Sequence, residues 1–268
     1  MQPDILITEL YPFGRRSLEE EFNALLSAAH AMPRRPVVLA SIRDILAPPS
    51  KPKKAVQADA VIAEYYDAVL VHSDPSATPL EISWPVSAML GEKLQYTGYV
   101  APPAPTAHPQ RAGDGEVLVS AGGGSVGDAL FETACLAAAQ MPDTRWRLLV
   151  GGSDATQRIE RLQAIGSPAV IEPARPDFRQ MLPLAAASVS MCGYNTALDL
   201  LQCGTPAVLI PFDAGKEVEQ GLRAQSLKPM PGFKVVTSAD LTPDSLCQAI
   251  REAMTAPRRD TGNLLFHG

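Results

Sequence analysis

The sequence predicts an α/β protein with two domains, each built on a parallel sheet covered by helices. Three observations lead to this fold class. Short apolar runs alternate with helical patterns along most of the 268 residues, as in doubly wound sheets. The apolar runs lack an alternation of polar and apolar positions, which is typical of strands buried on both faces. Between the two halves, residues 101–115 are rich in Pro and Gly and carry no periodicity, which indicates a linker.

The first domain is expected over residues 1–100. A buried strand over 3–10 is followed by Ser17 and Glu20, whose spacing is that of a capping box at the start of a helix. The Pro- and Lys-rich segment 48–54 should form a surface loop. The other expected elements are strands at 36–41, 68–72 and 93–98 and helices at 18–30 and 56–66.

The second domain, expected over residues 116–268, alternates more regularly. Ligands bind at the carboxyl ends of the strands in a doubly wound sheet, so the loops that leave these strands are the places to search for a site. The expected strands lie at 115–122, 146–152, 169–173, 187–193, 206–212 and 233–236, and the expected helices lie near 128–140, 154–164, 177–186, 194–203, 217–227 and 243–254.

The composition limits the function. Apolar residues make up 46% of the chain, and 23 Lys and Arg against 29 Asp and Glu give a net charge of -6, which excludes a general nucleic-acid binder. No leader peptide or membrane-spanning run is visible, so we expect a cytoplasmic protein for which peripheral contact with a membrane stays open. The four cysteines lie far apart and are expected to be reduced thiols, with neither a disulfide nor a metal site: Cys135, Cys192, Cys203 and Cys247.

The first candidate loop contains Gly122, Gly123, Gly124 and Ser125, between a strand and a helix. Adjacent glycines let a ligand approach the backbone, and the helix N-terminus behind them carries a partial positive charge. This combination suits a diphosphate, although the loop is neither a Walker loop nor a strict GxGxxG motif. The alternative is a glycine turn needed only for tight packing of the helix on the strand.

The second candidate loop contains Gly193, Asn195 and Thr196 and again opens a helix. Asn195 or Thr196 is expected to cap that helix. Asp199 shares a helix face with Thr196, and its carboxylate can accept hydrogen bonds from two adjacent hydroxyls, as on a ribose. The alternative is that Asp199 only complements the helix dipole.

The third candidate loop leads to Glu219, Gln220 and Arg223 in the first turns of a helix, where side chains can reach a ligand at the sheet edge. The alternative is that Glu219 and Arg223 form an ordinary surface pair. The histidines have no metal-ligand spacing, and His72, which ends a predicted strand, is a weaker candidate for catalysis. No catalytic residue is assigned.

Together the three loops resemble the nucleotide-sugar signature of GT-B glycosyltransferases, in particular the family 28 type branch of the peptidoglycan N-acetylglucosaminyltransferase MurG. The resemblance spans about 116–254 and rests on the order and spacing of 193–196, 199–212 and 219–224. The first part of the chain resembles a group of uncharacterised predicted glycosyltransferases, at 3–16, 41–46 and 96–99.

The resemblance implies that the site binds a UDP-sugar as substrate, with no further cofactor and no metal, because helix dipoles and side chains stabilise the leaving diphosphate. Asp199 stands where an acidic residue of the family binds the ribose hydroxyls. The resemblance also implies that Gly193, Asn195 and Thr196 contact the diphosphate and that Glu219 and Gln220 contact the donor sugar. Phe178 is expected near the base, and Arg223 belongs to the signature. Gly122 to Ser125 are expected to face the interdomain cleft found in members of the family.

The chain also departs from the family. GT-B members begin with a strand and a Gly-rich loop carrying a His, which often supplies the catalytic base, and nothing like it is present. The resemblance therefore implies that the N-terminal, acceptor-side domain is incomplete. A sheet reduced in this way would expose an edge and part of its core.

Two functions of different classes follow. The first is a metal-independent glycosyltransferase that moves a hexose or an N-acetylhexosamine from a UDP-sugar to an unknown acceptor. The second is a donor-nucleotide-binding module without turnover of its own, which needs a partner chain, a second copy or the missing amino-terminal segment. An epimerase or a UDP-sugar hydrolase is a less favoured third function, since both share the donor site.

Overall fold

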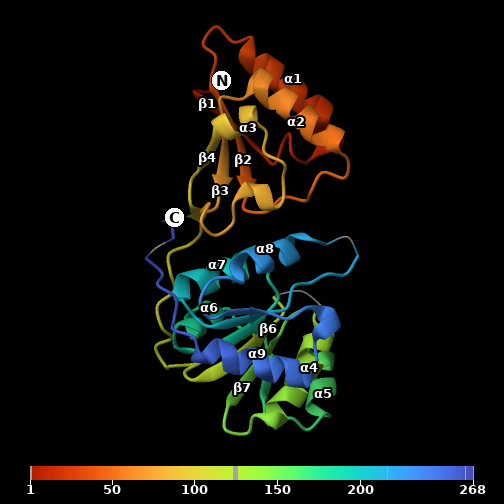
Figure 1. The fold of residues 1–268 in the computed structure, drawn as a ribbon, viewed down its shortest axis with the longest axis vertical. Helices are drawn as coiled ribbons and strands as arrows, with labels where there is room; N and C mark the ends of the chain where they lie inside the picture. The colour runs from red at the N-terminus through yellow and green to blue at the C-terminus, as the bar shows by residue number, and fades with distance from the viewer. Residues whose placement is uncertain (1, 123–125, 216, 263, 268) are drawn as a thin grey trace. The chain divides into compact units, whose positions relative to one another are not determined.

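The computed structural model describes residues 2–122, 126–215, 217–262 and 264–267. The chain divides into two compact units (Figure 1). Unit 1 comprises Met1–Ala101 and Leu264–Gly268, and unit 2 comprises Pro102–Asn263. The expected second domain ran from 116 to 268, whereas the structure groups the residues from Leu264 onward with unit 1 and the segment from Pro102 onward with unit 2.

Unit 1 is built on a four-stranded parallel sheet with the order β1-β2-β3-β4. A separate parallel pair joins β5 to the last strand, β12, and Tyr99 N donates a hydrogen bond to Leu265 O at 2.8 Å beside it. Leu265 N donates to Asp74 Oδ2 at 3.0 Å. The strands are β1 (Ile5–Glu9), β2 (Val37–Arg43), β3 (Ala68–His72), β4 (Leu94–Tyr96), β5 (Tyr99–Val100) and β12 (Phe266–His267).

The helices of unit 1 pack on one face of its sheet, and Figure 1 shows α1 and α2 together on that side. Val38, Ala40 and Val71 point into this core and are fully buried. On the other face, Ile5 and Ile7 are each 56% exposed. The expectation of a buried strand at 3–10 was therefore wrong, because helices cover the sheet on one side only. The helices are α1 (Glu19–His30), α2 (Pro52–Tyr65) and α3 (Ala88–Lys93).

Two local expectations for unit 1 were also wrong. Residues 16–18 form a 3-10 turn, so α1 begins at Glu19 with Leu18 as its N-cap. The capping box expected from Ser17 and Glu20 does not form, since no side chain caps this helix. The predicted loop 48–54 ends early because α2 already begins at Pro52, whose fixed φ angle suits the first helical position.

Unit 2 is built on a six-stranded parallel sheet with the order β11-β10-β9-β6-β7-β8. Its central strands are buried on both faces, because every residue of β6, β9 and β10 is buried. The strands are β6 (Glu116–Ser120), β7 (Arg145–Val150), β8 (Val170–Pro173), β9 (Ala187–Ser190), β10 (Ala207–Leu209) and β11 (Phe233–Val235). The six expected strands are therefore all present.

Helices cover both faces of the sheet of unit 2. Figure 1 shows α4, α5 and α9 on one side and α6, α7 and α8 on the other. The core of the first side joins sheet residues such as Val119 and Val189 to Phe131 of α4 and Ile250 of α9. The helices are α4 (Asp128–Gln140), α5 (Ala155–Gln163), α6 (Phe178–Met181), α7 (Tyr194–Cys203), α8 (Glu219–Leu227) and α9 (Pro243–Thr255).

The segment expected as a linker, 101–115, is packed rather than solvated over part of its length. His108 is 9% exposed, and its Nε2 lies 3.1 Å from Asp177 Oδ2. Gly113 has a φ angle of +85°, and a Cβ atom there would lie 2.7 Å from Met181 O. Over the described ranges, no helix is both long and apolar enough to cross a membrane, and all four cysteines are free thiols.

Candidate functional site

The carboxyl edge of the sheet in unit 2 brings the three candidate loops together. β6 lies between β7 and β9, and β9 lies between β6 and β10. The chain proceeds from β6 to β7 in one direction and from β9 to β10 in the other, so the strand order reverses between β6 and β9. In parallel sheets this reversal opens a crevice at the carboxyl ends, where ligands bind. The loops after β6, β9 and β10 therefore leave three adjacent strand ends.

Each of the three loops has a glycine that borders open space. A Cβ atom at Gly122, Gly193 or Gly215 would meet nothing within 4 Å. By contrast, a Cβ atom at Gly127 would lie 2.5 Å from the Cβ of Ala121. Tight packing therefore explains Gly127, which caps α4. At Gly122 the φ angle of +79° favours glycine, and the space beside it is open. The predicted contacts Gly123, Gly124 and Ser125 lie outside the described residues.

The start of α7 is suited to an anion. Gly193 is its N-cap, no described side chain caps it, and its first turn carries no acidic residue. The prediction that Asn195 or Thr196 caps the helix was wrong, because the helix begins one residue earlier, at Tyr194. Both residues lie in the first turn instead. Backbone N–H groups and the helix dipole at such an N-terminus attract negative charge.

Asp199 lies one turn further along α7, and its side chain is 14% exposed. Arg179 Nε donates to Asp199 Oδ1 at 2.6 Å, while no donor among the described residues contacts Oδ2. Burial raises the pKa of Asp199, and the guanidinium of Arg179 acts against that rise. The pair therefore keeps a carboxylate in a mostly buried position with one oxygen left to accept hydrogen bonds.

Arg179 was not predicted as a site residue, because it belongs to α6 and lies 20 residues from Asp199 along the chain. Its Nη2 donates to Gln202 Oε1 at 3.1 Å and to Pro103 O at 3.2 Å. Phe178, predicted near the base-binding segment, precedes Arg179 on the same helix and is half-buried. The packing of α6 beside α7 thus brings two separate candidate segments into one neighbourhood.

The first turns of α8 hold the loops in place. Gln220 Oε1 accepts a hydrogen bond from Phe212 N at 3.1 Å. Arg223 is 3% exposed, and its Nη1 donates to Cys192 O at 3.0 Å. Its guanidinium also lies 5.8 Å from the ring centre of Tyr194. Arg223 is therefore not the exposed surface residue of the alternative interpretation, because it is buried and ties α8 to the loop after β9.

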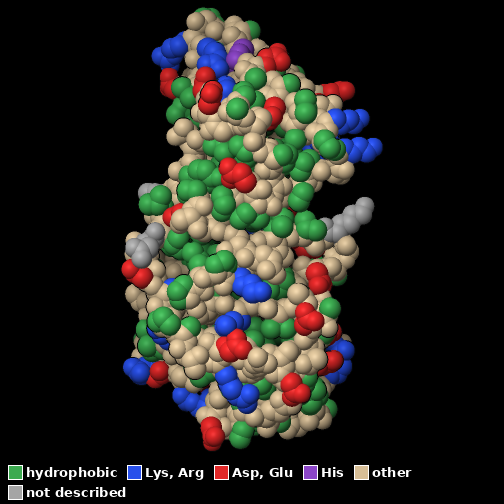
Figure 2. Space-filling model, viewed as in Figure 1, with side chains coloured by type: hydrophobic (Ala, Val, Ile, Leu, Met, Phe, Trp, Pro, Cys, Tyr) green, Lys and Arg blue, Asp and Glu red, His purple; other side chains and the backbone are tan. Residues whose placement is uncertain are grey.

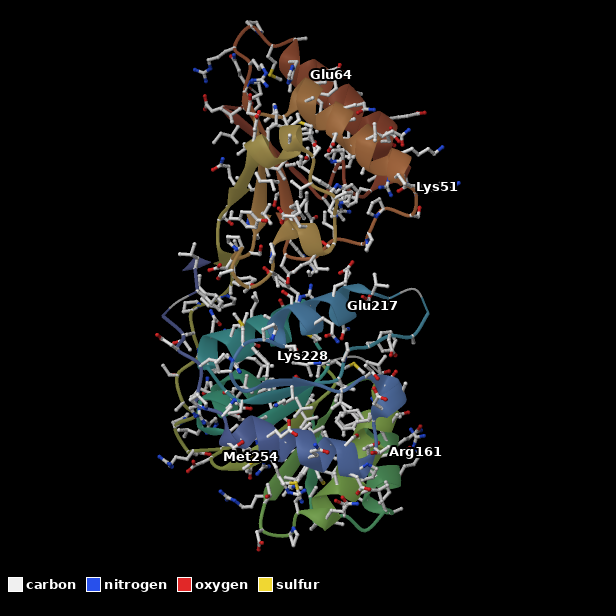
Figure 3. The ribbon with its side chains drawn as sticks, in the orientation of Figure 1. Lys51, Glu64, Arg161, Glu217, Lys228 and Met254 are labelled. Atoms are coloured by element: carbon white, nitrogen blue, oxygen red, sulfur yellow. The ribbon has the colours of Figure 1, made fainter. Side chains whose placement is uncertain are left out.

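A further carboxylate missed by sequence analysis caps α8. Glu217 Oε1 accepts hydrogen bonds from Glu219 N at 2.7 Å and Gln220 N at 3.3 Å. Figure 3 labels Glu217 at the start of this helix and Lys228 at its end. The N-terminus of α8 is thus satisfied by its own chain, whereas that of α7 has no side-chain cap. Of the two helix ends, α7 is the better anion site.

The charges of unit 2 fit a small ligand better than a polyanion. The face shown in Figure 2 carries acidic and basic side chains interspersed over unit 2, without a continuous basic field. In the described part of the chain, no group of three His, Cys, Asp or Glu is placed to hold a metal ion. The open glycines, the start of α7 and the carboxylate of Asp199 can together bind a molecule with a diphosphate and adjacent hydroxyls.

A family model described as the glycosyltransferase family 28 C-terminal domain matches residues 118–263, more than half of the 268 residues. The UDP-N-acetylglucosamine--N-acetylmuramyl-(pentapeptide) pyrophosphoryl-undecaprenol N-acetylglucosamine transferase of Brucella anthropi is 32% identical over 143 residues. That match covers 51% of this chain and 38% of the relative. The chain thus spans well under half of the length of this relative.

Two solved structures share the fold over most of this chain. The glycotransferase of kitacinnamycin has a TM-score of 0.63 at 17% identity, covering 96% of this chain and 68% of that one. MurG of Acinetobacter baumannii has a TM-score of 0.57 at 18% identity, and the match covers 88% of this chain and 68% of that one. At these identities the likeness establishes the fold alone, which is the GT-B type expected from the sequence.

Proposed function

Because the chain belongs to glycosyltransferase family 28 through the C-terminal domain of that family, we propose that it transfers a sugar from a nucleotide-sugar donor to an acceptor. The observation that carries the proposal is the meeting of three open glycine loops, an uncapped helix start and Asp199 at adjacent strand ends of unit 2. Each group is common alone. Their convergence at the reversal of strand order matches the place where nucleotides bind in such sheets.

The proposed donor is a UDP-sugar carrying a hexose or an N-acetylhexosamine. Asp199 accepts hydrogen bonds from the ribose hydroxyls through the oxygen that Arg179 leaves open. The diphosphate lies against the start of α7, where Asn195 and Thr196 form the first turn. Gln220 and Glu219 form hydrogen bonds with the hydroxyls of the donor sugar. The name of the Brucella anthropi relative, which specifies UDP-N-acetylglucosamine, supports the choice of donor.

The proposed transfer is metal-independent. When the bond between the sugar and the diphosphate breaks, negative charge grows on the leaving oxygen. Backbone N–H groups at the start of α7 and the dipole of that helix can stabilise this charge without a cation. A cytoplasmic location with peripheral membrane contact remains a prediction, which the word undecaprenol in the name of the relative supports.

Unit 1 favours a second candidate function. Its sheet leaves Ile5 and Ile7 exposed on the face without helices, and β1 is an edge strand of the sheet formed by the described residues. A binding module that works with a further chain or segment would cover such a face. Light scattering coupled to size exclusion, together with a donor-hydrolysis assay, separates the two functions. Turnover by a monomer would rule out the second candidate.

Calorimetry tests donor binding with the full chain, titrated with UDP, UDP-N-acetylglucosamine and UDP-glucose. We expect saturable binding, and the Asp199→Ala variant should weaken UDP by roughly 10- to 100-fold, the loss of one or two charged hydrogen bonds. Inorganic pyrophosphate should bind both proteins equally, because it has no ribose.

The matched control is Asp143→Ala, which removes an exposed carboxylate from the turn before β7, at the amino edge of the same sheet. We expect it to bind UDP as the unaltered chain does. If no UDP-sugar or UDP binds, or if both variants weaken UDP equally, the proposed donor site is wrong.

A further inference from the structure

The outer edge of β1 presents backbone groups that have no partner within unit 1. Val37 N donates a hydrogen bond to Asp4 O at 3.0 Å, so the backbone groups of Asp4 point toward β2. The backbone groups of successive strand residues point to alternate sides, and those of Ile5 and Ile7 therefore point away from the sheet. Among the described residues, none bonds to them. β1 can thus accept a further strand.

The other edge strands of the two main sheets carry features that discourage pairing with another chain. β8 contains Pro173, β11 contains Lys234, and β4 is only three residues long. Short strands, Pro and Lys are the usual protection of a sheet edge. β1 has five residues and contains neither Pro nor Lys. In the described part of the chain, β1 is therefore the long edge strand without such protection, as expected where another strand covers it.

The helix α1 continues this edge in the helical layer of unit 1. α2 lies against both α1 and α3, so α1 is the outermost of the three helices, on the side of β1. Ser27 and His30 of α1 face α2, because both contact Tyr65. On the opposite side of α1, Leu18 and Leu25 lie two turns apart and are 42% and 46% exposed. Exposed apolar side chains thus accompany the open strand.

The spacing of strands and helices suits a second copy of the chain at this edge. A two-fold axis perpendicular to the sheet, midway between β1 and its copy, lies about 2.4 Å from each strand. α1 connects β1 to the neighbouring β2 and lies over both strands, which places it about 4.8 Å from that axis. The two copies of α1 then lie about 10 Å apart, a distance at which helices pack. Strands and helices can therefore pair at the same time.

The charges at the two ends of α1 are complementary in such a pair. Glu19, Glu20 and Glu21 lie in the first turn of the helix, whereas Arg34 and Arg35 follow its end. The two-fold axis makes the two helices antiparallel, so the acidic start of each lies near the basic end of the other. Opposite charges across an interface favour the correct partner and orientation.

We propose that this edge of unit 1 is a dimer interface, in which β1 pairs antiparallel with β1 of a second copy while Leu18 and Leu25 contact the second α1. Ile5 of each copy lies opposite Ile7 of the other, and the two residues exchange both backbone hydrogen bonds. Their side chains stay on the open face of the sheet. A register centred on Ile7 would instead place Ile5 opposite the charged Glu9. The interface concerns unit 1 alone and goes beyond the proposed glycosyl transfer.

Light scattering coupled to size exclusion, over a dilution series of the full chain, tests the interface. We expect the mass to rise toward twice that of one chain as the concentration rises. Leu25→Glu should raise the dissociation constant of the dimer by at least about 10-fold, because the two-fold axis places the added charge in the interface twice. Ile7→Pro should also weaken the dimer, since it removes an outward N–H group, and an edge strand tolerates Pro at such a position.

The matched control is Val56→Glu, which adds the same charge to α2. Val56 is 68% exposed and belongs to the helix that lies between α1 and α3, away from the proposed interface. We expect this variant to dimerise as the unaltered chain does. Circular dichroism confirms that each variant is folded. Equal dissociation constants for Leu25→Glu and Val56→Glu would overturn the proposed interface.

Hydrogen exchange of the backbone amides, measured by NMR, tests the pairing of the two strands. The amides of Ile5 and Ile7 should exchange slowly in concentrated solution and fast in dilute solution, because they have a partner only in the dimer. Those of Leu6 and Thr8, which point toward β2, should be protected in both. A chain that stays monomeric at the highest concentration would overturn the proposal. A dimer in which the amides of Ile5 and Ile7 exchange freely would do so too, as would association that continues beyond two copies.

Discussion

The two sheets of the chain are built from similar apolar strands but are buried differently. In unit 2, helices lie on both faces, and β6, β9 and β10 are buried at every position. In unit 1, helices cover one face, and β2 alternates between exposed and buried positions. An apolar strand therefore does not show by itself how many faces of its sheet are covered. The stability of unit 2 should depend on its strands more strongly than that of unit 1.

The chain offers a separate probe for each unit. Trp84 lies in unit 1 and Trp146 lies in unit 2, both buried, and the sequence has no other tryptophan. Replacing one of them with Phe leaves fluorescence that reports the unfolding of one unit. All of the following measurements use urea unfolding of these two single-tryptophan backgrounds.

The largest expected effect comes from core truncation. Leu148 on β7 is fully buried, so Leu148→Ala should lower the unfolding free energy of unit 2 by about 2–5 kcal/mol. Ile7→Ala, on the uncovered face of unit 1, should change that of unit 1 by less than about 0.5 kcal/mol. Similar losses in the two units would show that the open face of unit 1 is packed in solution, contrary to the exposure of Ile5 and Ile7.

An intermediate effect on the unfolding free energy is expected from replacing a buried arginine of unit 2. Arg158 is 2% exposed and donates to Asp128 Oδ1 at 2.6 Å, Gly151 O at 2.9 Å and Val126 O at 2.8 Å. Arg158→Met removes the hydrogen-bond donor of these three acceptors and should lower the unfolding free energy of unit 2 by about 2–3 kcal/mol. The matched change in unit 1 is Arg34→Met, at an exposed ion pair with Asp4.

Because exposed ion pairs contribute little, the change at Arg34 should be within the error of the unfolding curves. A large loss there would mean that charge pairs stabilise unit 1 in place of the missing packing. The two units would then differ in the kind of interaction that stabilises them rather than in the amount of stabilisation.

The smallest expected effect is a loss of stability of unit 1 at alkaline pH. Burial raises the pKa of Tyr66 to about 12 from its usual 10. Above pH 10 the unfolded chain loses this proton more readily than the folded chain, so the stability of unit 1 falls as pH rises through the interval from 10 to 12. At pH 11 the loss is about 1 kcal/mol. In the Tyr66→Phe variant, the slope of the Trp84 signal against pH should flatten, and an unchanged slope would contradict the assignment.

Sequence reasoning predicted most of the secondary structure. The expected strands of unit 2 are all present, and the expected loops do leave adjacent strand ends. Periodicity succeeds here because parallel strands and their helices are specified by local apolar patterns. It did not predict β5 and β12, since two-residue strands have no period and pair across nearly the whole chain.

The site residues were harder to predict than the fold. Gly122, Gly193 and Asp199 belong to loops and helix starts that spacing can identify. Arg179 was missed because its partner lies in another helix, and only tertiary packing brings them together. The open space beside Gly215 could not be predicted for a different reason, since a glycine beside open space has the same sequence signal as any turn glycine.

The hydrogen bonds of His72 in unit 1 show a third limit of prediction from sequence. His72 was visible as the last residue of a strand, but Ser41 and Thr97 carry no motif, and their contact with His72 depends on the register of β2, β3 and β4. A shift of one residue in that register would turn Ser41 to the helix-covered face.

The pairing of β12 with β5 has a consequence for protein synthesis. Residues 264–267 complete unit 1, yet a ribosome releases them only after all of unit 2 has emerged. Unit 2 can begin to fold while Tyr99 still lacks its backbone partner at Leu265. The nascent chain thus holds an unfinished first unit throughout the synthesis of the second, and its final hydrogen bonds form last.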